Sequence, residues 1–236
     1  MTKSRRYHLL DSLRGLAVIS MIIYHAVWDM VYIFGINLPW YRSASASLWQ
    51  KSICYTFILL SGFCHSLGRE KFMRSLIILA CSAVITLATL LLMPENLILF
   101  GVLTLIGSCM LIMIPLDKIM AKRSPFAGLI LSLITFVITN IVIFPASWHK
   151  NYFTAYLGFP PSNFASQDYF PLVPWFFLYL AGYFLYRLFK KKGMMSWLSS
   201  PKITPLEWIG RHSLEIYMLH QPIIYSILYV IFKIIK

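Results

Sequence analysis

The sequence predicts an all-α fold: a polytopic transmembrane helical bundle of about seven spans, with a cytoplasmic N-terminus and the C-terminus outside. Of the 236 residues 59% are hydrophobic and only 12% are charged, and the mean hydropathy is +0.71. A soluble domain of this length needs a polar shell, which eight acidic residues cannot supply. Apolar runs recur at the length of roughly 20 residues that crosses a bilayer.

Seven such runs follow one another along the chain. We expect the spans at residues 13–35, 48–67, 75–93, 97–114, 127–145, 171–189 and 213–233. A tight turn at Pro94, Glu95 and Asn96 joins the third run to the fourth, and the longest loop is residues 146–170. No internal repeat and no Gly/Ser linker divides the chain, so we expect a single domain over residues 1–236.

The basic residues indicate the orientation. Sixteen of the 21 Lys and Arg residues fall on one side if the seven runs alternate, and five fall on the other. The richer side, which includes the N-terminus, is expected to be cytoplasmic. This topology also explains the net charge of +13, which in a soluble protein would suggest a nucleic-acid binder. We therefore expect no nucleic-acid partner.

The cysteines predict neither a disulfide framework nor a metal site. All four lie within apolar stretches and none forms a CxxC pair: Cys54, Cys64, Cys81 and Cys109. They are interpreted as small packing residues, and no metal is expected. Together with the basic N-terminus, this pattern favours a multi-pass protein of the bacterial cytoplasmic membrane.

Four ionisable residues form a stripe along the first span. At 100° per residue, Arg14 lies about 20° from His25 around the helix, and roughly 16 Å from it along the axis. Asp11 and Asp29 each lie about 40° from His25 around the helix, so all four residues share one stripe. Asp11 is expected to be the N-cap of the helix. Arg14 is either a positive-inside anchor or a ligand-binding residue.

His25 and Asp29 are spaced i,i+4 within apolar surroundings. Ionisable groups inside a span are costly and usually mark a functional site. A carboxylate that fixes the tautomer of an imidazole makes that imidazole a candidate general base. The alternative is a buried polar pair that only holds helices together.

The last span contains a second polar group. His220 is followed by Gln221 and Pro222, and the proline removes a helical donor, which predicts a kink beside His220. A kink lined by His and Gln within a span favours a site over packing. At the start of this segment Arg211 and Glu215 are spaced to pair.

Two further regions allow more than one interpretation. His65, Arg69 and Arg74 are expected near the cytoplasmic end of the second span, where they form a cationic mouth or, for the arginines, simple anchors. The aromatic residues of loop 146–170 form an interfacial belt, stack on a sugar or line a re-entrant segment.

Four blocks of the chain resemble the heparan-α-glucosaminide N-acetyltransferase catalytic-domain family of transmembrane acyltransferases. The blocks are RYHLLDSLRGLAVISMIIYHAVWD (6–29), LILFGVLTLIG (97–107), DYFPLVPWFFLYLAGYFLYRL (168–188) and GRHSLEIYMLHQPII (210–224). LRGLAVISMIIYH, LLSGF and SLEIYMLHQP are also similar to the larger family that O-acylates bacterial surface sugars. The chain departs from the pattern at Thr104, where the family often has His.

The resemblance implies acyl transfer from cytoplasmic acyl-CoA, with acetyl-CoA as the expected donor. It implies that His25 is catalytic and that Arg14, Arg69 and Arg74 receive the CoA phosphates. We add Asp29 and His220 to the expected catalytic residues, and Arg211 and Gln221 to those expected to bind the donor; His220 or Gln221 is expected to donate to the developing oxyanion. His25 acts as a base or carries the acyl group itself.

The implied acceptor is a sugar hydroxyl or amine at the outer face, on a bacterial envelope glycan or a lipid-linked sugar. The expected partners are thus the lipid bilayer, acyl-CoA and this carbohydrate, and a homodimer stays open. One alternative is a small proton-coupled transporter that uses the pair of His25 and Asp29. A scaffold whose polar residues only hold helices together is the other.

Overall fold

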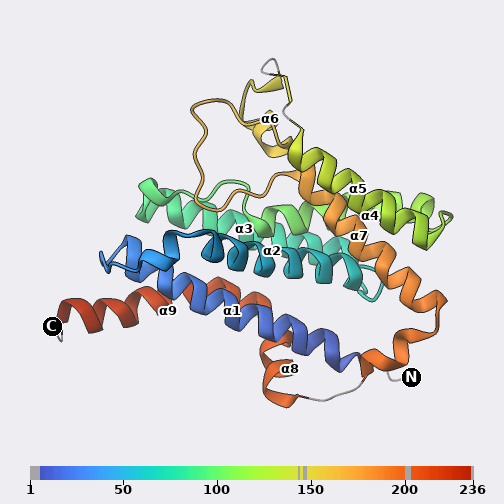
Figure 1. The fold of residues 1–236 in the computed structure, drawn as a ribbon, viewed down its shortest axis with the longest axis horizontal. Helices are drawn as coiled ribbons and strands as arrows, with labels where there is room; N and C mark the ends of the chain where they lie inside the picture. Colours follow the sequence, from blue (N-terminus) through green and yellow to red (C-terminus); the bar gives the residue numbers. More distant parts are fainter. Residues whose placement is uncertain (1–5, 143, 146–147, 200–202, 235–236) are drawn as a thin grey trace. The chain divides into compact units, whose positions relative to one another are not determined.

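The computed structural model describes residues 6–142, 144–145, 148–199 and 203–234, and over these residues the chain is helical without strands (Figure 1). Its longer helices are α1 (His8–Tyr32), α2 (Ala44–Cys64), α3 (Lys71–Leu92), α4 (Val102–Met120), α5 (Pro125–Ile141), α7 (Leu172–Lys191) and α9 (Ser213–Tyr229). The shorter ones are η1 (Pro39–Arg42), η2 (Pro94–Asn96), α6 (Tyr152–Leu157), η4 (Met194–Ser199), α8 (Thr204–Arg211) and η5 (Val230–Ile234). Lys3, Arg5, Lys202 and Lys236, which entered the charge count, lie outside the described residues.

Each predicted span coincides with one helix, and the all-α prediction is confirmed. Within the described residues five helical segments are long and apolar enough to cross a membrane: residues 8–32, 71–92, 102–120, 172–191 and 213–233. The predicted spans 48–67 and 127–145 correspond to α2 and α5, which are not among these five. Helix α5 is apolar but has only 17 residues.

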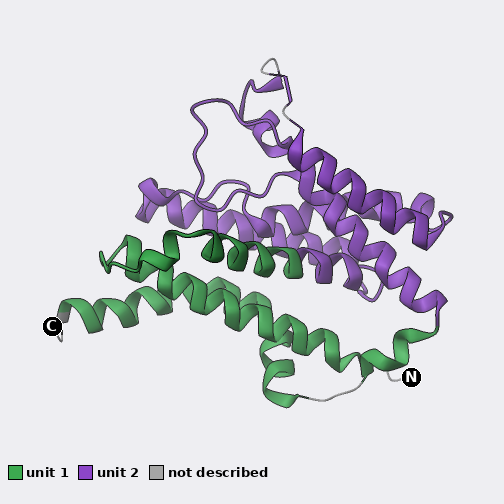
Figure 2. Cartoon of the chain, viewed as in Figure 1, with its two compact units in different colours: residues 1–57, 193–236 green, residues 58–192 purple. Residues whose placement is uncertain are grey.

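The chain forms two compact units (Figure 2). Unit 1 comprises residues 1–57 and 193–236, and unit 2 comprises residues 58–192. Helix α2 passes through the boundary, so its first two-thirds belong to unit 1 and its end to unit 2. Each unit is described below by itself.

In unit 1, α1 packs on α8 and α9. The contact with α8 depends on two glycines, because a Cβ on Gly15 would overlap the backbone oxygen of Leu206 and a Cβ on Gly210 would overlap that of Asp11. Such close backbone approach is typical of helix pairs in membranes. The two helices are therefore held in one register.

Helices α1 and α9 run in the same direction. Along α1, His25 contacts His220 and Asp29 contacts Gln221 one residue further along α9. The ring of Phe34, just beyond α1, then contacts rings still further along the C-terminal segment. Because the residue numbers of the contacting partners rise together along α1 and along α9, these two helices are parallel.

In unit 2, α3 and α4 are antiparallel neighbours (Figure 1). Ser82 bonds Thr104, whereas Lys71 near the start of α3 bonds Asp117 near the end of α4. Helices α5 and α7 also pack against each other. Pro125 begins α5, and the Ser124 side chain caps it by accepting from an N–H in its first turn, so the start of this helix is fixed by its sequence.

A second pair of glycines brings the end of α2 against α7. A Cβ on Gly62 would overlap the backbone oxygen of Tyr179, and a Cβ on Gly182 would overlap that of Leu59. Both contacts lie within unit 2. Gly62 belongs to the LLSGF motif, so the close approach explains the glycine of that motif.

Helix α4 begins later than predicted. The predicted span starts at residue 97, but residues 97–101 are not helical, and Phe100 has a φ of 55°. These residues instead bond to residues 166–170. The bonds run from Gln167 N–H to the Leu97 carbonyl at 3.0 Å and from Phe170 N–H to the Phe100 carbonyl at 2.8 Å. We call this paired segment the strap.

The strap caps α4. Asp168 accepts a hydrogen bond from the Val102 N–H through Oδ2 at 3.2 Å, at the first residue of the helix. A Cβ on Gly101 would lie 2.7 Å from the same oxygen. The sequence predicts one span from this apolar run, whereas the carboxylate of Asp168, 66 positions further along the chain, decides where the helix starts.

Candidate functional site

His25 and His220 face each other across α1 and α9 in unit 1. His25 Nδ1 lies 2.6 Å from His220 Nε2, and the ring planes are 21° apart. His220 is buried and His25 is half-buried. Two residues that the sequence separates by 195 positions therefore form one hydrogen-bonded dyad.

The hydrogen bonds assign a tautomer to each ring. His220 Nδ1 lies 2.6 Å from the Tyr217 carbonyl oxygen, and because a carbonyl only accepts, this nitrogen carries a proton. Neutral His220 then accepts at Nε2, so His25 donates from Nδ1. The lone pair of His25 is left on Nε2, which makes this atom the basic nitrogen of the dyad.

Asp29 bonds to Gln221 rather than to His25. Its Oδ1 accepts a hydrogen bond from Gln221 Nε2 at 2.6 Å, and its Oδ2 is buried with no hydrogen-bond partner in the described part of the chain. The predicted local pair of His25 and Asp29 is thus replaced by two contacts between helices. The reason is that α9 brings acceptor and donor groups alongside α1, which spacing within α1 does not disclose.

Aromatic side chains line the same part of α1. The Tyr24 ring packs against the rings of Tyr41 and Trp49, each at a centroid distance of 5.2 Å. Trp49 donates from Nε1 to the Ser20 hydroxyl at 2.7 Å. These contacts fix the α1 residues that precede His25 within a largely apolar environment.

The prediction that Asp11 is the N-cap of α1 is wrong. The helix begins at His8 with Tyr7 as N-cap, and no side chain caps it. Asp11 lies in the first turn, where its carboxylate pairs with Arg14 at 3.4 Å and with Arg6 at 3.6 Å. Helix α1 continues without interruption from Arg14 to His25, so the two residues share a continuous helix as expected.

Arg211 pairs with Glu207 rather than with Glu215. Arg211 and His8 both bond to Glu207 Oε2, at 2.9 and 2.8 Å. These bonds, first that of His8, lower the pKa of the Glu207 carboxyl. Because α8 ends at Arg211 and α9 begins at Ser213, Glu215 lies in another helix. The i,i+4 spacing of Glu207 and Arg211 is present in the sequence beside that of Arg211 and Glu215, and the break between α8 and α9 decides between them.

His65, Arg69 and Arg74 lie in unit 2. Arg69 and Arg74 are exposed. His65 is buried, and its Nδ1 lies 3.0 Å from the Tyr179 hydroxyl, whereas its Nε2 has no hydrogen-bond partner within the described residues. A buried His65 that contacts Tyr179 of α7 does not fit the predicted cationic mouth, in which its side chain would be accessible together with the arginines.

Unit 2 also contains a partly exposed ion pair that the sequence analysis missed. Lys71 Nζ lies 3.0 Å from Asp117 Oδ2, and the Tyr183 hydroxyl donates to Asp117 Oδ1 at 2.6 Å. The three side chains come from α3, α4 and α7. Only the position of Lys71 at the start of an apolar run, and of Asp117 near the end of the next, hinted at the pair.

The loop aromatics pack largely on one another. Phe144 stacks on Trp148, and both contact Phe159. Tyr152 and Phe153 nevertheless present exposed rings. In the described part of the chain no three His, Cys, Asp or Glu side chains are placed to hold one metal ion.

The four sequence blocks that resemble the acetyltransferase family contact one another in two pairs. The first and fourth blocks supply His25, Asp29, His220 and Gln221 and the two glycines between α1 and α8, whereas the second and third form the strap. Comparison with curated proteins gives no significant match, and neither does comparison with solved structures. The family described as heparan-alpha-glucosaminide N-acetyltransferase, catalytic, matches residues 6–222. This match includes residues of both units, the first three blocks and all but the last two residues of the fourth. The chain therefore belongs to that family of membrane acetyltransferases, which use acetyl-CoA.

Proposed function

We propose that the protein transfers the acetyl group of cytoplasmic acetyl-CoA to a sugar hydroxyl or amine at the outer side of a membrane. The observation that carries this proposal is the dyad of His25 and His220, which leaves a lone pair on His25 Nε2. Family membership supports the reaction type. Residues 1–236 act as one catalytic domain, because the family match covers parts of both units.

In this mechanism His25 is the general base. Nε2 takes the proton of the acceptor O–H or N–H while the acceptor oxygen or nitrogen attacks the thioester carbonyl carbon. The C–S bond then breaks, and the leaving thiolate takes the proton from the imidazolium, which restores His25. His220 stabilises the imidazolium by accepting from its Nδ1–H.

Asp29 and Gln221 form a second polar contact between α1 and α9, next to the dyad. The amide of Gln221 is oriented by its bond to Asp29 Oδ1 and supplies a polar contact for the donor. Arg14 and Arg211 of unit 1 are proposed to bind the CoA phosphates, as are Arg69 and Arg74 of unit 2, since in the predicted topology all four belong to the side that carries most of the Lys and Arg residues.

The helix directions support an odd number of spans, as in the proposed topology of seven. Parallel first and last spans require an odd number of crossings, and α1 and α9 are parallel. Within unit 2, α3 and α4 are antiparallel, as consecutive spans must be. The excess of Lys and Arg on one side favours a cytoplasmic N-terminus.

The acceptor class and the membrane follow from the same proposal. A donor on the cytoplasmic side and a site within the bilayer favour an acceptor reached from the outer side, such as an envelope glycan or a lipid-linked sugar of the bacterial cytoplasmic membrane. Exposed aromatic rings of the loop, such as Phe153, offer surfaces on which a sugar can stack.

The test uses the full chain purified in lipid nanodiscs and incubated with acetyl-CoA, with glucosamine as probe acceptor. Free thiol release and acetylated product are measured for the wild type and for His25→Ala. We expect acetyl-CoA to bind both proteins with similar affinity. Turnover of the variant should fall by at least about 100-fold, since general-base catalysis contributes about 10²–10⁴-fold.

The control is the thermal unfolding midpoint of both proteins, which separates a catalytic from a purely structural role of His25. Unchanged turnover in His25→Ala would overturn the assignment. Absence of acetyl-CoA binding in the wild type would overturn the proposed reaction and favour the proton-coupled transporter.

A further inference from the structure

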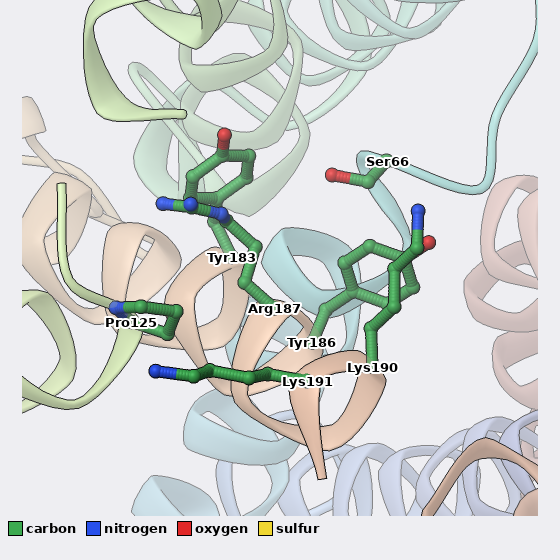
Figure 3. A pocket seen from close by; sticks show the side chains of 7 residues that line it. All are labelled: Ser66, Pro125, Tyr183, Tyr186, Arg187, Lys190 and Lys191. Atoms are coloured by element: carbon green, nitrogen blue, oxygen red, sulfur yellow. The ribbon is translucent and has the colours of Figure 1, made fainter. Parts of the chain in front are cut away.

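Unit 2 contains a pocket whose lining residues have no role in the proposed mechanism of His25. It has a volume of about 480 Å³, within the range of small-molecule sites. It lies at the end of α7, where Tyr183, Tyr186, Arg187, Lys190 and Lys191 line it, together with Ser66 just beyond α2 (Figure 3). The first residue of α5, Pro125, completes the wall.

The lining is strongly positive. Three of its seven residues are Arg or Lys, and none is Asp or Glu. The nearest carboxylate in contact with the lining is that of Asp117, which bonds the Tyr183 hydroxyl. Its charge is already balanced by Lys71. The pocket therefore keeps its positive charge.

One of the cations is fixed in place. The guanidinium of Arg187 bonds the carbonyls of Met120, Ala121 and Arg123 at 2.5–3.0 Å, just at the end of α4. It also lies over the ring of Tyr183 at 5.9 Å. Arg187 thus contributes a stationary charge, while its N–H groups are engaged elsewhere.

The other two cations are able to bind a ligand directly. Lys190 and Lys191 are exposed, and Figure 3 shows their side chains extending along two sides of the pocket. The Ser66 hydroxyl points into the space between the elements. Two ammonium groups and a hydroxyl beside a fixed guanidinium suit a ligand with more than one negative charge.

We propose that this pocket binds a phosphate-bearing group. Two sources carry this chemistry: the nucleotide end of acyl-CoA, in which case the inference rests on the proposed function, and the headgroup of an anionic phospholipid. Both are available at the basic end of α7, whose last turn carries Lys190 and Lys191.

The experiment compares two double variants of the full chain in nanodiscs. Lys190→Gln/Lys191→Gln removes two charges from the pocket, and Lys118→Gln/Lys122→Gln removes two exposed charges outside its lining. CoA binding is titrated in zwitterionic phosphatidylcholine nanodiscs. Retention of phosphatidylglycerol over phosphatidylcholine is measured by mass spectrometry of the co-purified lipid. Thermal unfolding establishes that both variants are folded.

A nucleotide ligand predicts that Lys190→Gln/Lys191→Gln weakens CoA binding by at least about tenfold while the control stays within about twofold. A lipid ligand predicts unchanged CoA binding and loss of the phosphatidylglycerol preference in the same variant alone. The inference is overturned if the two double variants behave alike with both probes. Because binding is measured without turnover, failure of this inference is distinct from failure of the His25 assignment, which thiol release reports.

Discussion

The two units place a carboxylate among their apolar helices in different ways, since Asp29 of unit 1 is buried and Asp117 of unit 2 is partly exposed. In unit 2, Asp117 uses both oxygens, one for Lys71 and one for the Tyr183 hydroxyl. In unit 1, Asp29 bonds only the neutral amide of Gln221 through Oδ1, and Oδ2 has no hydrogen-bond partner within the described residues. A buried carboxylate without a cation is costly, whereas a paired one is ordinary.

The imidazoles of the two units differ in their partners. His65 in unit 2 contacts a tyrosine hydroxyl through Nδ1, while His25 in unit 1 contacts a second imidazole through Nδ1. In its carboxylate, unit 2 therefore uses both oxygens to hold helices together, whereas unit 1 leaves one oxygen of Asp29 without a hydrogen-bond partner among the described residues. The difference teaches that composition alone does not distinguish the two, because both units contain His, Asp and Tyr within apolar helices.

The largest effect should come from the imidazole partners. Replacing His220 with Ala removes the acceptor of the His25 Nδ1–H, so kcat for acetyl transfer should fall by about 100-fold while KM for acetyl-CoA stays within about twofold. Replacing Tyr179 with Phe removes the hydroxyl that His65 contacts and should leave kcat within about twofold. Initial rates of thiol release measure both. Equal losses in the two variants would remove the distinction between the units.

The glycine contacts should affect both units alike. Gly15→Ala in unit 1 and Gly62→Ala in unit 2 each place a methyl group against a backbone oxygen, so each should lower the free energy of unfolding by about 2 kcal/mol. Leu16→Ala, at an exposed neighbouring position, is the control and should stay within about 0.5 kcal/mol. Denaturant titration in detergent micelles measures the changes. Wild-type stability in either glycine variant would contradict the close approach.

The two carboxylates offer the most direct contrast. Asp29→Asn should lower turnover by about tenfold, because Gln221 loses a charged partner, while stability is kept or raised since a buried charge is removed. Asp117→Asn breaks a half-exposed ion pair and should cost about 1 kcal/mol of stability with turnover unchanged. Rates and unfolding midpoints are measured side by side. The opposite pattern, with turnover lost only in Asp117→Asn, would reverse the roles of the units.

The smallest effect concerns Asp168, which caps α4 without a cation. Burial raises the pKa of Asp168 from 3.8 to about 6, so the folded state favours its protonated form. Its contribution to stability is therefore full below about pH 4 and is lost as the pH rises through about 6. The unfolding midpoint of Asp168→Asn minus that of the wild type should rise between pH 4 and pH 6 and then level off. A difference independent of pH would show that the carboxyl is not buried as described.

Much of the fold could be predicted from the sequence because long apolar runs specify helices locally. All seven predicted spans coincide with helices, and the turn at Pro94–Asn96 is a short 3-10 helix. The start of α4 could not be predicted, since it depends on Asp168, which is distant in sequence. The N-cap assigned to Asp11 failed because the helix begins three residues earlier, at His8.

The sequence predicted which residues belong to the site, but not which of them form hydrogen bonds with one another. His25, Asp29, His220 and Gln221 all stand out as polar residues in apolar spans. Their pairing requires knowing that α9 lies beside α1 and in the same direction, which no local spacing gives. For the same reason the sequence suggested Glu215 as the partner of Arg211, whereas a helix break at His212 selects Glu207.

The strap also sets an order of events during folding. Its Leu99–Ser166 contact joins residues 67 positions apart, so a long loop must close before the two segments can bond. A nascent chain that has not yet reached residue 168 has no carboxylate for the first turn of α4. The start of helix α4 is therefore fixed only after the third block has been synthesised.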